Sequence, residues 1–380
     1  MKLPESVKIA LDTLSSHGFE AFVVGGCVRD YIRKTTPTDY DITTPSTPDE
    51  TKAVFKDFPV FLQGKKHGTV GVIINGEKLE ITTHRQDGEY IDHRRPETVS
   101  FSRSLRDDLS RRDFTVNAIA WSEKSGIVDL FGGTCDIEKK IIRCVGDPDR
   151  RFDEDALRIL RALRFSATLG FEIEENTSAS IFKNAHLLRG VSAERVREEI
   201  EKLSLGDRRL EVFEKYQSVM EILLGEIDTS PLSRFGKGVA GRDFLGLVFS
   251  LTDGQCIDKL KFSNREKSFY KGVRTLFCSA PPKSDYDVKK AVSVYGTHTV
   301  SSFLKITDLG LLNRFNELSE AGELLEKKDL AINGTRLNEL GIPQGRETGI
   351  ALDRLFELVL QGKIENNTES IEIYVKAQML

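Results

Sequence analysis

The spacing of hydrophobic residues changes along the chain. Up to about residue 125, short apolar runs end in glycine or alternate with polar residues, which is typical of strands. Beyond about residue 150, apolar residues recur every three or four positions, as they do along one face of a helix. The pattern therefore predicts an α+β fold, in which an N-terminal mixed β-sheet is followed by an all-helical extension.

Short β-rich segments predict the sheet. Asn75-Gly76 lies between two alternating segments, and this dipeptide favours a two-residue hairpin turn, so the flanking segments should pair antiparallel. The expected strands are residues 21–26, 39–44, 70–74, 78–83 and 114–121.

Helical spacing is clearest over residues 154–169, where apolar residues follow one face and arginines another. Gly206-Asp207 and the proline-containing stretch 281–284 are plausible boundaries between helical segments. Further helices are expected at residues 6–16, just after Gly26, and at 193–203, 210–224, 244–251, 287–294, 300–304 and 350–360.

Composition and charge narrow the class of protein. The 380 residues carry a formal net charge of -4, so any binding of nucleic acid must depend on positive charge that is concentrated locally. No apolar run reaches the roughly 18 residues of a membrane span, and the chain begins with helical spacing that includes Glu5, so a cytoplasmic protein is expected. The five cysteines form no CxxC pair, which predicts buried thiols without disulfides or a zinc ribbon.

The segment Asp39-Tyr40-Asp41 is a candidate for metal chemistry. On a strand, residues two positions apart face the same side, so both carboxylates should point one way. Mg²⁺ favours such oxygen ligands when other positions stay open to phosphates and water, although a D-x-D pattern is more often a solvated surface pair. Just upstream, Gly25-Gly26 ends a strand and opens a helix, where backbone N–H groups could hold a triphosphate or simply form a tight turn.

Together, residues 23–44 (VVGGCVRDYIRKTTPTDYDITT) resemble the signature of the polymerase-β-like nucleotidyltransferase superfamily. More narrowly, they resemble its class II branch, which holds the tRNA CCA-adding enzymes and the bacterial poly(A) polymerases. The resemblance is strong over roughly residues 19–206 and recovers near the C-terminus. Further blocks match in order: RRPETVSF (94–101), DDLSRRDFTVNAIA (107–120), VDLFGG (128–133) and FDEDALRILRALRFSATLGF (152–171).

This resemblance implies that Asp39 and Asp41 are the catalytic residues and hold two Mg²⁺ ions. The ions would align the 3′-hydroxyl of an RNA with the α-phosphate of an incoming nucleotide, so that pyrophosphate is displaced in line. Glu80 is a possible third carboxylate, but a salt bridge to a nearby lysine or arginine is the favoured interpretation.

Three residues of the N-terminal part are expected to bind the nucleotide through the same resemblance. Gly26 and Arg29 would contact the triphosphate, while the alternative for Arg29 is an ion pair with Asp30 or Asp41. Arg112 would bind the nucleotide, and its alternative is a plain surface charge.

The block at Asp155 and Arg158 would select the base. Read as one helix, these residues are three apart, and the plain alternative is an i,i+3 salt bridge. Cytosine and adenine both present a ring acceptor beside an amino donor, which a guanidinium and a carboxylate can satisfy, whereas uracil and guanine present the reverse. The resemblance gives Arg161 and Arg164 nucleotide contacts too, and an ion pair between helices is the alternative for Arg164.

The resemblance implies a four-part chain: a catalytic head (1–145), a helical neck (146–206), a helical body (207–320) and a tail that binds tRNA (321–380), the helical parts being elongated. The expected activity is template-independent addition of C, C and A to tRNA from CTP and ATP, with an A-adding enzyme or a poly(A) polymerase as the alternative. A polar loop over residues 85–104 favours full CCA addition. No membrane and no obligate protein partner is indicated.

Overall fold

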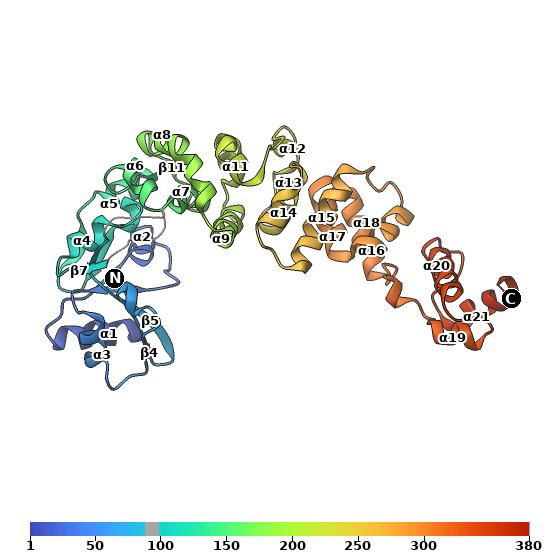
Figure 1. Cartoon of the computed structure of the whole chain (residues 1–380), viewed down its shortest axis with the longest axis horizontal. Helices are drawn as coiled ribbons and strands as arrows, with labels where there is room; N and C mark the ends of the chain where they lie inside the picture. The colour runs from blue at the N-terminus through green and yellow to red at the C-terminus, as the bar shows by residue number, and fades with distance from the viewer. Residues whose placement is uncertain (88–98, 380) are drawn as a thin grey trace. The chain divides into compact units, whose positions relative to one another are not determined.

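The computed structural model describes residues 1–87 and 99–379 and divides the chain into two compact units, Met1–Leu223 and Leu224–Leu380. The first unit holds a mixed β-sheet and helices, and the second is built from helices (Figure 1). The α+β fold expected from the sequence is thus confirmed. The four-part division of the chain stays a prediction.

Seven strands form one mixed sheet in the order β3-β4-β5-β2-β1-β8-β9. Strands β2 and β5 run parallel, whereas the other neighbours pair antiparallel. The strands are β1 (Phe22–Val24), β2 (Asp41–Thr44), β3 (Val60–Phe61), β4 (Thr69–Ile74), β5 (Glu77–Thr83), β8 (Ile119–Ser122) and β9 (Gly126–Asp129).

The hairpin predicted around Asn75-Gly76 is confirmed. Strands β4 and β5 pair with Ile74 opposite Glu77. Asn75 and Gly76 both have positive φ angles, 52° and 82°, as this type of two-residue turn requires. Two smaller sheets pair β6 (Arg85–Asp87) with β7 (Val99–Phe101) and β10 (Ile141–Ile142) with β11 (Glu172–Ile173). Residues 88–98 of the polar loop lie outside the described residues.

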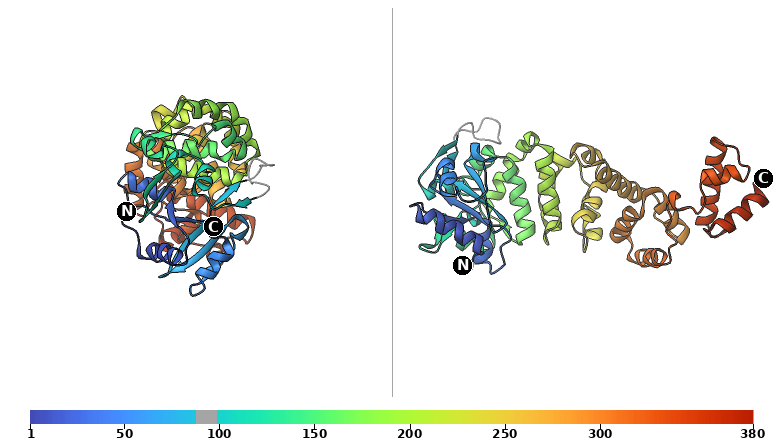
Figure 2. Two further views of the ribbon diagram at one scale, coloured as in Figure 1. Left: turned by 90° about the vertical axis from the view of Figure 1, so that its left-hand side faces the viewer. Right: turned by 90° about the horizontal axis from the view of Figure 1, so that it is seen from below.

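Helices cover the sheet and continue beyond it within the first unit, where Figure 2 shows the green helices beside the blue strands. They are α1 (Glu5–Ser16), α2 (Gly26–Ile32), α3 (Pro48–Val54), α4 (Leu105–Ser110), α5 (Gly133–Lys139), α6 (Pro148–Glu154), α7 (Leu157–Leu169), α8 (Glu175–Asn184), α9 (Ala193–Ser204), α10 (Arg209–Lys215) and α11 (Gln217–Leu224), with 3-10 turns η1 (Lys65–His67), η2 (Thr115–Asn117) and η3 (Ala185–Gly190).

The helix predicted over residues 154–169 is wrong at its start. Helix α6 ends at Glu154 and α7 begins at Leu157, while Asp155 between them has extended backbone angles of -147° and 101°. The Leu157 N–H donates a hydrogen bond of 3.1 Å to the Asp155 carboxylate. Because aspartate makes such local bonds readily, it ends one helix and starts the next.

Two other predicted elements also differ from the structure. The strand expected over residues 114–121 begins only at Ile119, since Thr115–Asn117 form the 3-10 turn η2. The helix expected over 210–224 is divided into α10 and α11 at Tyr216. The remaining predicted helices are confirmed, with bounds that shift by a few residues. Three cysteines are buried, as predicted for all five, but Cys135 and Cys278 are exposed.

Buried apolar residues of the second unit include two separate hydrophobic clusters. One gathers Val288, Val300 and Phe315, and the other gathers Leu337, Leu355 and Ile371. Its helices are α12 (Leu232–Phe235), α13 (Gly241–Ser250), α14 (Gln255–Lys259), α15 (Asn264–Cys278), α16 (Asp285–Tyr295), α17 (Thr297–Thr307), α18 (Leu309–Glu320), the 3-10 turn η4 (Lys327–Asp329), α19 (Gly334–Glu339), α20 (Arg346–Leu360) and α21 (Thr368–Gln378). Within the described ranges of both units, no helix is long and apolar enough to cross a membrane.

A chain of polar side chains links α2 to α7. Arg161 donates two hydrogen bonds, of 2.8 and 2.5 Å, to the buried Asp113 carboxylate. Asn117 donates to the other oxygen of Asp113 at 3.1 Å and accepts from Arg29 at 2.7 Å. Burial alone would raise the pKa of Asp113, but the charge of Arg161 and these hydrogen bonds hold it at about 2. The chain therefore joins α2, η2 and α7 through one carboxylate.

Replacing this carboxylate should change how stability depends on pH. The pKa of about 2 for folded Asp113 lies below the ordinary value of 3.8. The ion pair therefore contributes about 2 kcal/mol at neutral pH, and this contribution is lost as the pH falls from about 4 toward about 2. We expect Asp113→Asn to lower the free energy of unfolding at neutral pH and to flatten its decline in acid, measured by denaturant titration.

Asp49→Asn is the matched control. Asp49 is 73% exposed and pairs with Lys65 at the surface, where solvent screens the charges. This variant should keep the wild-type acid profile. An acid decline of equal slope in Asp113→Asn and the wild type would contradict the role assigned to Asp113.

Candidate active site

Carboxylates converge at one end of strand β2. Asp41 is the first residue of this strand and lies in register with Val24 of β1 and Glu80 of β5. Asp39 lies two residues before the strand, so the expectation that both aspartates are on the strand is wrong for Asp39. The negative charges of Glu80 and Asp39 nevertheless act on Asp41. Two further acidic groups therefore lie near Asp41: Glu80 on β5 and Asp39 just before β2.

Among the described residues, the carboxylates of Asp39 and Asp41 have no ion-pair partner. Neither forms an ion pair within the part of the chain that the structure describes; Thr38 donates a 3.4 Å hydrogen bond to Asp39. The pKa of Asp41 is raised, mainly because the surrounding protein desolvates it, and Glu80 and Asp39 add to this while Arg112 opposes it. Such a site favours a cation.

Asp39 and Asp41 could bind a divalent cation only together with further ligands, such as water or phosphate oxygens. Across residues 1–87 and 99–379, no group of three or more His, Cys, Asp or Glu side chains is arranged to hold a metal ion. Two carboxylates are still suitable for Mg²⁺, which keeps several waters and binds substrate phosphates. Glu80 forms an ion pair with Lys78 at 3.3 Å, so the salt-bridge interpretation of Glu80 is confirmed.

Gly25 and Gly26 form a tight connection between β1 and α2. Gly25 has a φ of +80°, and a Cβ there would lie 3.1 Å from the Arg112 guanidinium. Helix α2 begins at Gly26. The absence of side chains thus lets Arg112 approach the backbone where the predicted triphosphate site begins.

Arg29 adopts the alternative given for it from the sequence. Its guanidinium donates two hydrogen bonds of 3.0 Å to the Asp30 carboxylate and one to Asn117, and the side chain is buried. It also lies 5.4 Å from the centre of the Phe165 ring. A contact between Arg29 and a triphosphate stays a prediction.

Arg111 and Arg112 are not plain surface charges. Both pair with Asp108, which is fully buried, at 2.6 and 3.2 Å, and each side chain is 18% exposed. Burial alone would raise the pKa of Asp108, but the two arginines hold it below its ordinary range. Asp108 thus fixes Arg112 within range of Asp41.

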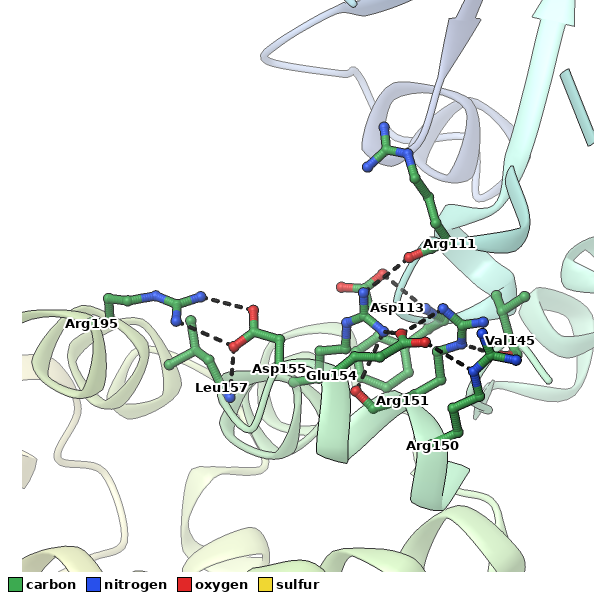
Figure 3. Close-up of polar contacts among 11 residues, drawn as sticks. Arg111, Asp113, Val145, Arg150, Arg151, Glu154, Asp155, Leu157 and Arg195 are labelled. Atoms are coloured by element: carbon green, nitrogen blue, oxygen red, sulfur yellow. Dashed lines mark hydrogen bonds and ion pairs between the residues drawn. The ribbon is translucent and has the colours of Figure 1, made fainter. Parts of the chain in front are cut away.

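The two residues expected to read the base are held by different partners. Asp155 reaches toward Arg195 on α9, which Figure 3 shows away from Glu154. Arg158 is buried and pairs with Glu154 at 2.9 Å. The alternative of a salt bridge between Asp155 and Arg158 is wrong, because the break between α6 and α7 removes their helical spacing.

Arg161 and Arg164 lie around one aromatic ring. Their guanidinium carbons lie 5.4 and 3.8 Å from the centre of the Phe165 ring. Arg161 is held by Asp113, and Arg164 donates a 2.6 Å hydrogen bond to the buried Glu199 of α9. The ion pair between helices that was the alternative for Arg164 is thus present, while nucleotide contacts of both arginines stay predictions.

Sequence reasoning missed three residues that organise this site: Asp108, Arg195 and Glu199. The spacing of Asp108 from the arginines at 111 and 112 is an i,i+3 and i,i+4 signal that could have revealed it. Arg195 and Glu199 are four apart on a predicted helix, but nothing in the sequence shows which element that helix faces.

Comparisons with known proteins agree with this geometry. Residues 21–143 match the family model described as the Poly A polymerase head domain. Residues 170–217 match the model described as the probable RNA and SrmB-binding site of polymerase A. The first match spans the sheet with its carboxylates and Arg112, and the second includes helix α9, which carries Arg195 and Glu199.

Similar proteins cover nearly the whole chain. The CCA-adding enzyme of Staphylococcus epidermidis is 36% identical over 99% of this chain and 98% of its own. That of Lactobacillus helveticus is 35% identical over 96% and 95%. The structure of the Bacillus stearothermophilus CCA-adding enzyme in complex with CTP has a TM-score of 0.82 at 29% identity, covering 100% of this chain and 98% of that one.

A more distant structure, the Thermotoga maritima CCA-adding enzyme complexed with tRNA_CCA, has a TM-score of 0.69 at 20% identity and shows the shared fold. It covers 100% of this chain and 97% of that one. On the strength of the full-length relatives, the protein belongs to the family of CCA-adding enzymes, the tRNA nucleotidyltransferases that its motifs resemble.

Proposed function

We propose that this protein adds C, C and A to the 3′ end of tRNA, using CTP and ATP and releasing pyrophosphate. The observation that carries the proposal is the pair Asp39 and Asp41, which forms no ion pair among the described residues and lies close to Arg112, in a unit that also holds Asp155 and Arg158. The names of the full-length relatives and the CTP complex of the Bacillus stearothermophilus enzyme support it.

Asp39 and Asp41 would hold Mg²⁺. The bound metal would activate the RNA 3′-hydroxyl and neutralise charge on the leaving pyrophosphate. Arg112, fixed by Asp108, offers positive charge to the nucleotide next to the carboxylates. Gly26 offers a backbone N–H at the start of α2, and Arg29 ties the same helix to Asn117. The chain's residues thereby orient the α-phosphate toward the attacking oxygen.

Asp155 and Arg158 would choose the nucleotide without a template. Arg158 would donate to the ring nitrogen and Asp155 would accept from the amino group that cytosine and adenine share. Uracil or guanine would place a donor opposite Arg158 and an acceptor opposite Asp155. Buried polar groups would then stay unpaired, so UTP and GTP would bind much more weakly than CTP and ATP. Arg161 and Arg164, stacked about Phe165, would add contacts to the same nucleotide.

The alternatives within the family are an A-adding enzyme and a poly(A) polymerase. The polar loop that favours full CCA addition lies mostly outside the described residues, so its support comes from the sequence. The tRNA contacts of residues 321–380, the absence of an obligate protein partner and a cytoplasmic location likewise stay predictions.

A product assay separates these activities. The protein should extend a tRNA that ends at its discriminator base by three nucleotides when CTP, ATP and Mg²⁺ are supplied, as read on a denaturing gel. With CTP alone it should stop after two additions. Extension only of tRNA that already ends in CC would indicate the A-adding enzyme, and long ATP-only tails on unrelated RNA would indicate a poly(A) polymerase.

The metal assignment has its own test. Asp41→Ala should reduce incorporation by at least about 10³-fold, because losing metal stabilisation costs several kcal/mol. Binding of tRNA, measured by filter retention, should survive. Asp49→Ala is a control carboxylate, since Asp49 is 73% exposed and pairs with Lys65. Unchanged incorporation by Asp41→Ala would refute the role of Asp41.

A further inference from the structure

Arg195 grips the carboxylate that is proposed to read the base. Its two terminal nitrogens donate hydrogen bonds of 3.2 and 2.8 Å to Oδ1 and Oδ2 of Asp155. This fork-to-fork pairing fixes both the position and the plane of the carboxylate. The Arg195 and Asp155 side chains are 25% and 18% exposed, so both are largely enclosed and yet accessible to a small ligand.

The hydrogen bonds that Asp155 accepts leave one acceptor position of its carboxylate unused. A carboxylate offers about four acceptor positions, two on each oxygen. Oδ1 accepts from Arg195 and from the Leu157 N–H, whereas Oδ2 accepts from Arg195 alone. One acceptor position therefore remains on Oδ2, and a nucleobase amino group needs one.

Arg158 has a matching surplus of donors. Of the roughly five N–H groups of a guanidinium, three are used, by Glu154 and by the carbonyls of Arg151 and Arg111. None of these bonds involves Asp155 or Arg195. Removing Arg195 therefore releases Asp155 and leaves the anchors of Arg158 in place.

Helix α9 is packed into the first unit, and this packing fixes the position of Arg195. Val196 and Ile200 of the helix are buried, and Glu199, one turn after Arg195, holds Arg164 of α7 at 2.6 Å. Arg195 thus projects from a docked helix that also fixes another arginine of the site, so its guanidinium is positioned before a nucleotide arrives.

We propose that Arg195 is a specificity-determining positioning residue, which holds Asp155 so that one acceptor position faces the amino group of cytosine or adenine. This role rests on the proposed selection of bases by Asp155 and Arg158. Without Arg195 the carboxylate can rotate, and the amino group of CTP or ATP loses its fixed acceptor. Discrimination against UTP and GTP should then fall.

Arg195→Met tests the role by steady-state incorporation of each of the four nucleotides into tRNA. We expect kcat/KM for CTP and ATP to fall about 10- to 100-fold, chiefly through a higher KM. Values for UTP and GTP should stay within about threefold of wild type, so that selectivity drops by about tenfold or more. Arg195→Lys keeps the charge without the fork and should recover part of the selectivity.

Two comparisons separate positioning from a structural effect. In an Asp155→Ala background, adding Arg195→Met should cause no further loss of selectivity, because Arg195 acts through Asp155. Arg208→Met is the matched control: Arg208 is also 25% exposed and pairs with two carboxylates, Glu172 and Glu211, but it does not contact Asp155. It should keep wild-type selectivity.

Each outcome is decisive. Wild-type selectivity in Arg195→Met, an equal loss for all four nucleotides, or additive losses in the double variant would overturn the role of Arg195 alone. If Arg195→Met does not fold, the lysine variant decides in the same way, since full selectivity with lysine would also overturn it. A wild-type protein that incorporates no CTP would instead overturn the proposed function, and this role with it.

Discussion

A charge buried without a partner is costly, and the pairing of Asp113 with Arg161 is the constraint on which the active-site arrangement depends. Asp113 follows the two arginines that Asp108 anchors, and it holds α7 through Arg161. Through Asn117 it also reaches Arg29 of α2. One carboxylate thereby ties the glycine turn beside the sheet to the helix that begins just after Asp155. The groups proposed to bind phosphate and the groups proposed to read the base are set relative to each other within the first unit.

The arginines of the site form ion pairs within the protein, whereas its two proposed metal ligands do not among the described residues. A carboxylate partner is present for each of the arginines Arg29, Arg112, Arg158, Arg161 and Arg164. Asp39 and Asp41 have no cationic partner among the described residues. The arginines are thus held in place before any ligand binds, whereas the negative charge of Asp39 and Asp41 is only opposed by the nearby Arg112, an arrangement that suits the proposed cation.

Local sequence signals predicted the elements well and their contacts poorly. Asn75-Gly76 fixed a hairpin because its turn chemistry is local, and helical periodicity placed α7, α9 and α20 within a few residues. Periodicity could not reveal the break at Asp155, because a single side-chain bond to the Leu157 N–H outweighs it there. The motif pointed to Asp155, but its partner Arg195 lies 40 residues away on α9, and only the packing of α9 against α7 joins them.

The central claim is that side chains of this protein, without an RNA template, distinguish bases by the order of donor and acceptor. Equilibrium binding of CTP, ATP, UTP and GTP to the wild-type protein in the absence of tRNA tests it most directly, for example by titration calorimetry. CTP and ATP should bind at least about tenfold more tightly than UTP and GTP. Equal affinity for all four nucleotides would contradict it.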